Sequence, residues 1–530
     1  MPEKTQLHGV AKLFENYSEV TEPSEAQVEG QIPPWLDVTI LRNGPGMFRI
    51  GDTEYSHWFD GLAFIQRYFF QEGKMFYSAR YLESEAYKIN IAANRIVVGE
   101  FGTSGFTDPC KGFLGKLQTF FSEEHVTDNA SVNFFSVGDT VWAATETPRV
   151  VRVDPKNIKT LDNFDFNKTI TLHTFTAHQQ YDLENNVYHI GSRFGKNTDY
   201  VFTVTKNPKR TNKSTTEALE ETSIVAEIQA SESLYPAYYH SFGMTENYFI
   251  LFESPLRLDL KRLIARKILN ISFKESMVWR ENSPIHIRVI DKRSGKEVER
   301  KFRHDSLFSF HQANAFEKDG FIIMDYCAME RAGNLSQFDL KEIRSGGLAK
   351  AGDPKEAAYC YRMIIPLDFD PKNLKENQDL LKGKDFAGGC KAIWKNGEVW
   401  LQQEKLSEYA FEFPKINMRE NLKPHRFIYG AGLEWNSGGK VSLVKVDTVT
   451  RKTITWKRDH DEQIAGEPLF VQAPGAKDED EGVILAPILN FSDDDTPFVL
   501  VLNAKNFEEL ARCRVNHRVP LGFHAQVYPN

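Results

Sequence analysis

Four short segments of the chain each carry one histidine among apolar or small residues. Imidazole nitrogen is a ligand that suits iron, copper, nickel and zinc, so four such side chains brought together could hold one metal ion. A lone histidine beside strand-like residues is more often a buried core residue, and this alternative stays open for a chain with 14 histidines. The four segments are Thr176-Ala177-His178, Tyr238 to Gly243 with His240, Phe310 to Ala315 with His311, and Gly522 to Ala525 with His524.

Three glutamates stand in strand-like or turn contexts that would suit the support of such a metal site. A histidine that binds a metal normally donates its other ring N–H to a carboxylate or a carbonyl oxygen. A ligand set made only of imidazoles also leaves the charge of a dication uncompensated, so buried carboxylates should accompany the histidines. The candidates are Glu146, Glu412 and Glu467, for which exposure at the edge of a strand is the alternative.

The composition excludes several classes of protein. A net charge of −8 and a pI of about 6.0 give no general basic surface for a nucleic acid. Five cysteines without Cys-x-x-Cys spacing argue against a disulfide framework and against a thiolate zinc site. The N-terminal residues have no apolar core of the signal-peptide type, and no run reaches the roughly 18 to 20 apolar residues of a membrane-spanning helix. We therefore expect a cytoplasmic protein that is soluble or lies on a membrane surface.

Short runs of alternating apolar residues, bounded by Gly, Asn, Asp and Pro, predict an all-β fold. The first predicted strand is Val38 to Arg42, and the polar residues 1–31 before it are expected to wrap the outside. A loosely repeated unit of strand, turn and strand favours a propeller over a sandwich. The first three histidines lie roughly 60 to 70 residues apart, as if successive blades each offered one inner residue to a common axis. The repeated units begin at Lys88 to Asn90, Arg152 to Asp154, Val289 to Asp291, Lys445 to Asp447 and Val501 to Asn503.

Two stretches, residues 108–125 and 256–273, have apolar residues at helical rather than strand-like spacing. Each also carries basic residues, so each is read either as an amphipathic helix packed on the propeller or as a membrane-facing insertion. The apolar residues of the first stretch are Phe113, Leu114, Leu117, Phe120 and Phe121. Those of the second are Leu256, Leu260, Leu263, Ile264, Ile268 and Ile271.

Several motifs, each weak alone, are together specific. They are Met47 to Gly61, Asp108-Pro109-Cys110-Lys111, Thr145-Glu146-Thr147, His240-Ser241-Phe242-Gly243, Glu467-Pro468 and Asp480 to Val483. From about Trp35 to the C-terminus, the chain with these motifs resembles the carotenoid cleavage oxygenases, a family that includes the retinal pigment epithelium isomerohydrolase. Within the family, Gly46 to Tyr55 and Ala473 to Asp480 are most similar to animal β-carotene oxygenases.

The resemblance implies one domain over residues 1–530, a seven-bladed β-propeller with a cap of loops and short helices. It implies an Fe(II) ion bound by His178, His240, His311 and His524, with Glu146, Glu412 and Glu467 as carboxylates behind the ligands and Thr145 near an open coordination position. It also implies that the segment with Phe113, Leu114, Leu117, Phe120 and Phe121 dips into a membrane surface. Acylation of Cys110 and a plain thiol are both left open.

What the resemblance implies for function is oxidative cleavage of a carotenoid by O₂ at a conjugated double bond, giving retinal or apocarotenal products. The position of the cleaved bond and a coupled trans–cis isomerisation stay open. The first alternative is a retinyl-ester isomerohydrolase that uses the same iron without O₂. The second is a non-catalytic carotenoid-binding propeller. Gln179, Pro148 and Ala525 depart from the residues usual in the family, which leaves the regiochemistry in doubt.

Overall fold

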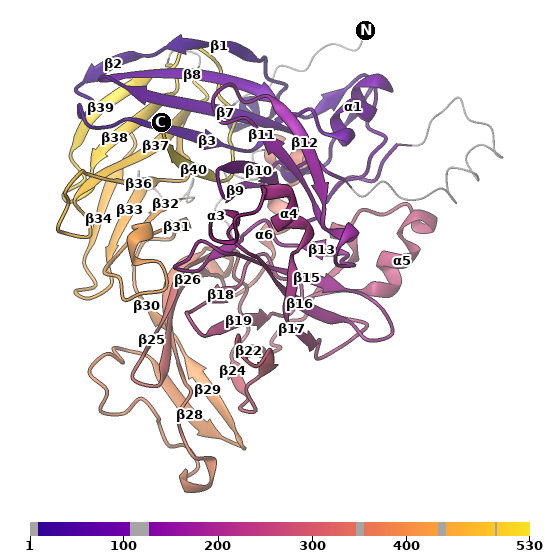
Figure 1. The fold of residues 1–530 in the computed structure, drawn as a ribbon, viewed down its shortest axis with the longest axis vertical. Helices are drawn as coiled ribbons and strands as arrows, with labels where there is room; N and C mark the ends of the chain where they lie inside the picture. The colour runs from indigo at the N-terminus through magenta and orange to yellow at the C-terminus, as the bar shows by residue number, and fades with distance from the viewer. Residues whose placement is uncertain (1–8, 107–126, 346–353, 433–440, 493–494) are drawn as a thin grey trace.

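The computed structural model describes residues 9–106, 127–345, 354–432, 441–492 and 495–530. Cys110 and the predicted membrane patch of Phe113, Leu114, Leu117, Phe120 and Phe121 lie outside the described residues. Within them the chain is an all-β propeller with at least six blades, as the sequence pattern predicted for the fold class. Sheets of mostly antiparallel strands are arranged around a common centre, and short helices lie among and beside them (Figure 1).

Seven sheets of the described residues have four or more strands, and we number them I to VII. Sheet I contains β1 (Val20–Glu25), β8 (Lys74–Tyr81), β7 (Leu62–Gln71), β3 (Val38–Arg42), β40 (Ala525–Pro529) and β4 (Pro45–Met47). Sheet II contains β9 (Asn133–Val137), β10 (Thr140–Ala144), β11 (Arg149–Val153) and β12 (Thr160–Asp165). Sheet III contains β13 (Thr174–Phe175), β14 (Gln180–Tyr181), β15 (Val187–Arg193), β16 (Asp199–Thr205) and β17 (Ser223–Gln229).

The remaining sheets follow in chain order. Sheet IV contains β18 (Gly243–Met244), β19 (Tyr248–Glu253), β22 (Ile285–Asp291), β23 (Lys296–Glu297), β24 (Phe302–His304), β28 (Lys391–Lys395) and β29 (Glu398–Gln402). Sheet V contains β25 (Gln312–Lys318), β26 (Phe321–Ala328), β27 (Tyr359–Pro366) and β30 (Glu404–Lys405). Sheet VI contains β31 (Glu412–Lys415), β32 (Phe427–Ala431), β33 (Val441–Asp447) and β34 (Thr453–Lys457). Sheet VII contains β2 (Gln27–Gly30), β35 (Gln463–Ala465), β36 (Leu469–Gln472), β37 (Gly482–Asn490), β38 (Phe498–Asn503) and β39 (Glu509–Arg514).

Short elements connect and cover these sheets. Two small hairpins pair β5 (Arg49–Ile50) with β6 (Thr53–Glu54) and β20 (Leu256–Leu258) with β21 (Met277–Trp279). The α-helices are α1 (Glu85–Ala92), α3 (Pro208–Thr211), α4 (Thr215–Glu220), α5 (Leu260–Leu269), α6 (Asn334–Gln337) and α7 (Leu340–Arg344). The 3-10 helices are η1 (Gly9–Phe14), η2 (Trp58–Asp60), η3 (Phe166–Lys168), η4 (Lys274–Ser276), η6 (Pro354–Glu356), η7 (Pro371–Asn373) and η8 (Met418–Glu420).

The sheets pack on one another through apolar faces, as β37 illustrates. Its residues from Val483 to Leu489 are all buried, which is the pattern of a strand covered on both faces. Val483 and Leu485 belong to a core cluster shared with sheet I, whereas Ile484 and Ala486 belong to one shared with sheet VI. The alternation of a strand thus sends successive side chains into two different cores.

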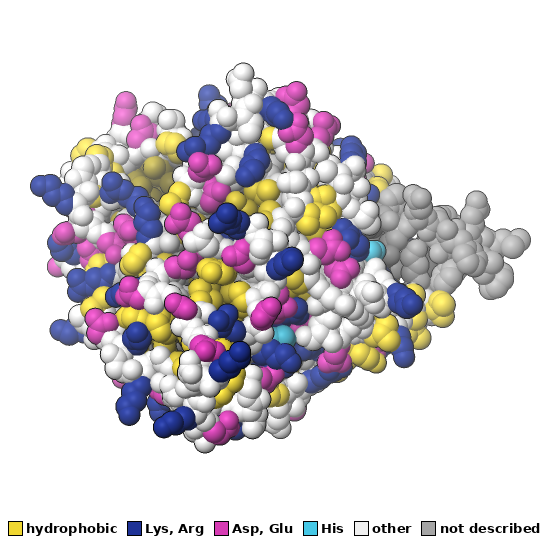
Figure 2. All heavy atoms as spheres, turned by 60° about the horizontal axis from the view of Figure 1, so that its bottom comes forward, with side chains coloured by type: hydrophobic (Ala, Val, Ile, Leu, Met, Phe, Trp, Pro, Cys, Tyr) yellow, Lys and Arg dark blue, Asp and Glu magenta, His cyan; other side chains and the backbone are white. Residues whose placement is uncertain are grey.

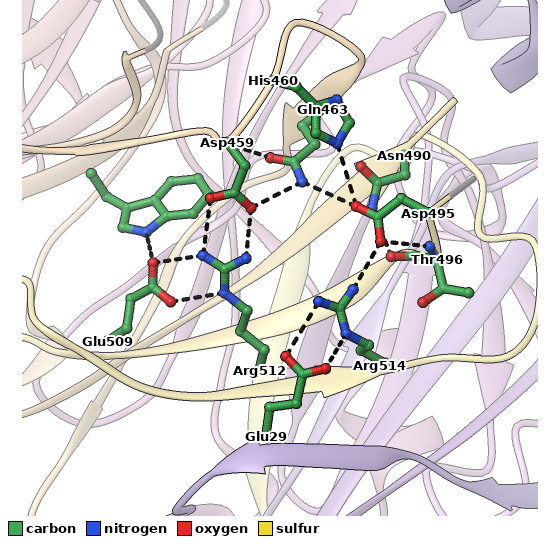
Figure 3. A network of polar contacts seen from close by, with 11 residues as sticks. Glu29, Asp459, His460, Gln463, Asn490, Asp495, Thr496, Glu509, Arg512 and Arg514 are labelled. Carbon is green, nitrogen blue, oxygen red and sulfur yellow. Dashed lines mark hydrogen bonds and ion pairs between the residues drawn. The ribbon is translucent and has the colours of Figure 1, made fainter. Parts of the chain in front are cut away.

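The two ends of the chain close the ring of sheets together. Strand β3 pairs antiparallel with β40, with Arg42 opposite Ala525, and β2 pairs with β39, with Gly30 opposite Ala511. Figure 1 shows the indigo N-terminal strands beside the yellow C-terminal strands. The Arg514 guanidinium binds the Glu29 carboxylate at 2.6 Å and so ties β2 to β39 within a larger polar network (Figure 3).

Three local predictions differ from the structure. The segment Lys88 to Asn90, predicted as a strand, lies in α1, because the Ser84 side chain accepts a hydrogen bond from Tyr87 N and begins a helix there. The helical spacing over residues 256–273 corresponds to a shorter helix, α5, since Asp259 caps its N-terminus and β20 precedes it. Two strands, β1 and β2, lie within residues 1–31, ahead of the strand predicted as the first.

We expect His189 to make the protein less stable in mild acid. The side chain of His189 is buried and stacked on Phe175, and burial lowers its pKa to about 3. As the pH falls below about 6.5, the unfolded state therefore binds a proton that the folded state does not, and stability falls. His189→Phe should reduce the loss of unfolding free energy between pH 7 and pH 5 by about 2 kcal/mol. Denaturant titration at the two pH values measures this, and an unchanged difference would contradict the assignment.

Candidate metal centre

The four histidines singled out in the sequence come together at the centre of the ring. His178 lies between β13 and β14, and His240, His311 and His524 lie just before β18, β25 and β40. These strands are edge strands of sheets III, IV, V and I, so each histidine comes from a different sheet. One nitrogen from each ring lies within 4.8 Å of the other three.

The spacing of these nitrogens fits one metal ion. The His178 and His240 Nε2 atoms are 2.8 Å apart, and the His311 and His524 Nε2 atoms are 3.1 Å apart. Nitrogen ligands bind first-row metals at about 2.0 to 2.1 Å, so two ligands at right angles are separated by about 3 Å. Burial lowers the pKa values of His178, His311 and His524 well below the usual range, and the neighbouring imidazoles lower them further. These three rings are therefore neutral, as metal ligands must be.

Each of the three predicted glutamates contacts a different histidine through the ring nitrogen that points away from the centre. Glu146 Oε1 lies 2.6 Å from His240 Nδ1, and Glu412 Oε2 lies 2.8 Å from His311 Nδ1. Glu467 Oε1 lies 2.7 Å from His524 Nδ1. A carboxylate accepts, so each Nδ1 carries the proton and each Nε2 presents its lone pair to the centre.

The glutamates come from the three sheets that supply no histidine. Glu146 follows β10 of sheet II, Glu412 begins β31 of sheet VI, and Glu467 lies between β35 and β36 of sheet VII. Glu412 and Glu467 are buried, and burial raises the pKa of Glu412 to about 8, a shift that a bound cation would oppose. Thr145, the residue before Glu146, is half-buried.

His178 is held differently from the other three histidines. Its main-chain N–H donates to Thr176 Oγ1 at 2.9 Å, and this hydroxyl donates to the main-chain oxygen of His240 at 2.7 Å. The Thr176 side chain therefore fixes the backbone of two candidate ligands relative to each other.

Two polar residues of the centre were not predicted from the sequence. The Tyr238 hydroxyl donates to both carboxylate oxygens of Glu146, at 2.8 and 3.0 Å, and the Lys415 ammonium contacts Glu467 Oε1 at 3.1 Å. Tyr238 lies two residues before His240, so the period of a strand could have placed both side chains on one face. Lys415 offered no such signal, because its partner belongs to another sheet.

An apolar cluster extends from the histidines toward α5. The Phe310 ring lies edge-on to the His240 ring at 5.2 Å, and Phe310 and Tyr238 belong to this cluster. Leu260 and Leu263 of α5 pack into it as well. Other members or packed neighbours are Phe59, Phe101, Phe194, Leu256, Leu258, Phe273, Trp279, Phe308 and Met329. The candidate metal centre therefore adjoins an aromatic, water-excluding region.

Comparisons with known proteins agree with this arrangement. Residues 13–528 match the family described as retinal pigment epithelial membrane protein. The human β,β-carotene 15,15'-dioxygenase is 35% identical over 515 residues, which cover 96% of this chain and 93% of the relative. The human mitochondrial carotenoid-cleaving dioxygenase is 33% identical over 533 residues, 98% of this chain and 91% of the relative.

The fold also resembles that of solved structures. An apocarotenoid oxygenase from Synechocystis superposes with a TM-score of 0.76 over 98% of both chains at 19% identity, a likeness of fold alone. The family match and the two human relatives extend over nearly the whole chain. This chain therefore belongs to the retinal pigment epithelial membrane protein family of carotenoid oxygenases.

Proposed function

We propose that the chain is a non-heme Fe(II) dioxygenase that cleaves a carotenoid at a conjugated double bond. The observation that carries this proposal is the set of four inward-facing imidazoles, three of them supported by carboxylates. The named activities of the human relatives supply the substrate class. Addition of both atoms of O₂ across one C=C bond, with loss of that bond, gives two carbonyl products and balances without a further reactant.

His178, His240, His311 and His524 would hold the iron. Bound Fe(II) would supply the chemistry that activates O₂ for addition to the double bond. Glu146, Glu412 and Glu467 keep the Nδ1 protons of their histidines in place. This orients the rings and makes the Nε2 lone pair a stronger ligand for the metal. The aromatic cluster that includes Phe310 and Phe308 would bind the polyene and exclude water. Thr145 would lie near an open position of the metal.

We further propose that the propeller has seven blades in one domain spanning residues 1–530. The support is that sheets I to VII each contribute one residue to the centre. Sheets I, III, IV and V supply the histidines, and sheets II, VI and VII supply the glutamates. Residues 1–31 would wrap this domain, since β1 and β2 each extend the edge of a sheet.

A membrane surface is the proposed source of the substrate. Helix α5 exposes three apolar side chains, Ile264 at 83%, Ile268 at 74% and Leu269 at 52%, beside the exposed Lys261 and Arg262. The helix lies at the right-hand edge in Figure 1, and hydrophobic and basic side chains gather at that edge in Figure 2. Among the described residues no helix is both long and apolar enough to span a membrane. The patch of Phe113, Leu114, Leu117, Phe120 and Phe121 that the sequence predicts, with Cys110 as an acyl site, lies outside the described residues and stays part of the proposal.

The second candidate is a retinyl-ester isomerohydrolase. The family that matches this chain carries the description retinal pigment epithelial membrane protein. Both activities would use the same four histidines. The named dioxygenases at 33 to 35% identity favour carotenoid cleavage over this alternative. Cleavage coupled to a trans–cis isomerisation remains part of the proposal.

We predict that the purified protein binds one iron per chain through the four histidines. His311→Ala should abolish turnover and lower the iron content, because it removes a ligand. Glu412→Gln should reduce activity by roughly 10 to 100-fold, the effect of losing an outer partner of a ligand. Metal analysis and turnover on the same samples measure both. His460→Asn, which changes a histidine of the polar network in Figure 3, is the control. Full iron content in His311→Ala would refute the ligand set.

We predict that α5 contributes to membrane binding. Ile264→Ser, Ile268→Ser and Leu269→Ser together should lower binding to partly anionic phospholipid vesicles by more than tenfold, because each buried CH₂ contributes about 0.8 kcal/mol. A triple Ser variant of Leu161, Leu183 and Val449, which are also exposed, is the matched control. Equal sedimentation of the two variants with vesicles would mean that α5 does not insert.

We predict oxygen-dependent cleavage of a carotenoid to aldehydes. The assay supplies a carotenoid and, separately, a retinyl ester, each with and without O₂, and follows aldehydes and retinol by chromatography. Retinal-type aldehydes formed only in air support the dioxygenase. Anaerobic conversion of the ester to an isomerised alcohol, with the carotenoid untouched in air, would reverse the choice. The cis or trans configuration of the double bonds in the aldehydes shows whether isomerisation accompanies cleavage.

A further inference from the structure

The three glutamates of the centre differ in their other contacts. Glu146 accepts hydrogen bonds from the neutral Tyr238 hydroxyl. Glu412 accepts one from the main-chain N–H of Phe413 at 3.1 Å, and its Oε1 has no hydrogen-bond partner among the described residues. Glu467 contacts a cation, since the Lys415 ammonium lies 3.1 Å from the same oxygen that accepts the His524 N–H. One carboxylate of three is therefore paired with a positive charge.

The backbone around Lys415 has an unusual shape that places this charge. The pairing of β31 with β32 shifts register between Glu412 and Lys415, and Phe413 has a φ of +54°. A bulky residue in the left-handed region is costly and persists only where its surroundings enforce it. The Phe413 ring packs against His311 and His524, with ring centroids 5.4 and 5.1 Å apart. This bulge directs Glu412 to one histidine and Lys415 to the carboxylate behind another.

The other cation near Glu467 has a different role. The Arg42 guanidinium is buried and lies 3.5 Å from the main-chain oxygen of Glu467 and 3.4 Å from that of Gly522. It therefore binds the backbone where β3 closes the ring. Lys415, with a side chain 25% exposed, is the cation that contacts the carboxylate, whose side chain is 1% exposed. Burying an ion pair is costly unless its geometry is good, so the pair needs an explanation beyond stability.

We propose that Lys415 is a positioning residue whose positive charge holds Glu467 and favours the divalent over the trivalent state of the metal. This inference rests on the proposed iron site. A bound dication, the three carboxylates and the Lys415 ammonium would together carry no net charge, and the buried Arg42 guanidinium adds one further positive charge near Glu467. Loss of one electron from the ferrous ion would add a positive charge near the ammonium, and no proton need move. The ammonium disfavours that oxidation by Coulomb repulsion, which is weakly screened in a buried site.

The test is the midpoint potential of the iron-loaded protein, measured with redox mediators without substrate. Lys415→Gln keeps a side-chain donor for Glu467 but removes the charge. We expect the ratio of ferric to ferrous iron at a fixed potential to rise roughly tenfold or more, a fall of about 59 mV or more in a one-electron couple. Lys415→Arg should restore the wild-type potential. Lys423→Gln, which removes an equal charge at an exposed position, is the matched control.

A double variant tests whether the charge of Lys415 sets the midpoint potential. Glu467→Gln removes the negative partner, so Lys415→Gln combined with Glu467→Gln should return the potential toward the wild-type value. If Lys415→Gln loses its iron, the midpoint potential of the double variant should still be lower than that of Glu467→Gln alone, by the shift expected for Lys415→Gln. An unchanged potential in Lys415→Gln, with iron retained, would overturn the inference and leave the iron site standing. Wild-type protein that binds no iron would instead overturn the proposed function.

Discussion

The convergence of four neutral imidazoles on one point is the constraint on which the rest of the structure depends. Imidazole rings this close cannot all be protonated, and burial holds the pKa values of His178, His311 and His524 well below the usual range. They come from positions as distant as His178 and His524, so only a closed arrangement of sheets can bring them together. The pairing of β3 with β40 provides this closure, one residue from His524.

The charges around this point follow from the same constraint. Each Nε2 can face inward only if Nδ1 keeps the proton, and Glu146, Glu412 and Glu467 fix that choice for three rings. Three carboxylates in a buried region repel one another unless positive charge offsets them. A bound metal dication would supply most of that charge, and Lys415 adds to it at Glu467. The same three carboxylates therefore both orient the histidines and set the charge of the centre.

Much of this arrangement was predictable because the motifs are local. Residue types and flanking sequence pointed to the four histidines and three glutamates, and alternating apolar runs predicted the β fold. The failures have physical causes. Ser84 begins a helix where the apolar pattern indicated a strand, and Asp259 shortens α5. Lys415 could not be found because its contact depends on how two sheets pack, which a bulge at Phe413 decides.

We propose that the four histidines bind one iron ion. Anomalous scattering from crystals of the protein as purified, collected on both sides of the iron absorption edge, tests it most directly. We expect one peak per chain that is present above the edge and lost below it, within bonding distance of Nε2 of His178, His240, His311 and His524. Absence of this peak, or a peak bound to other side chains, would show that these histidines do not hold iron.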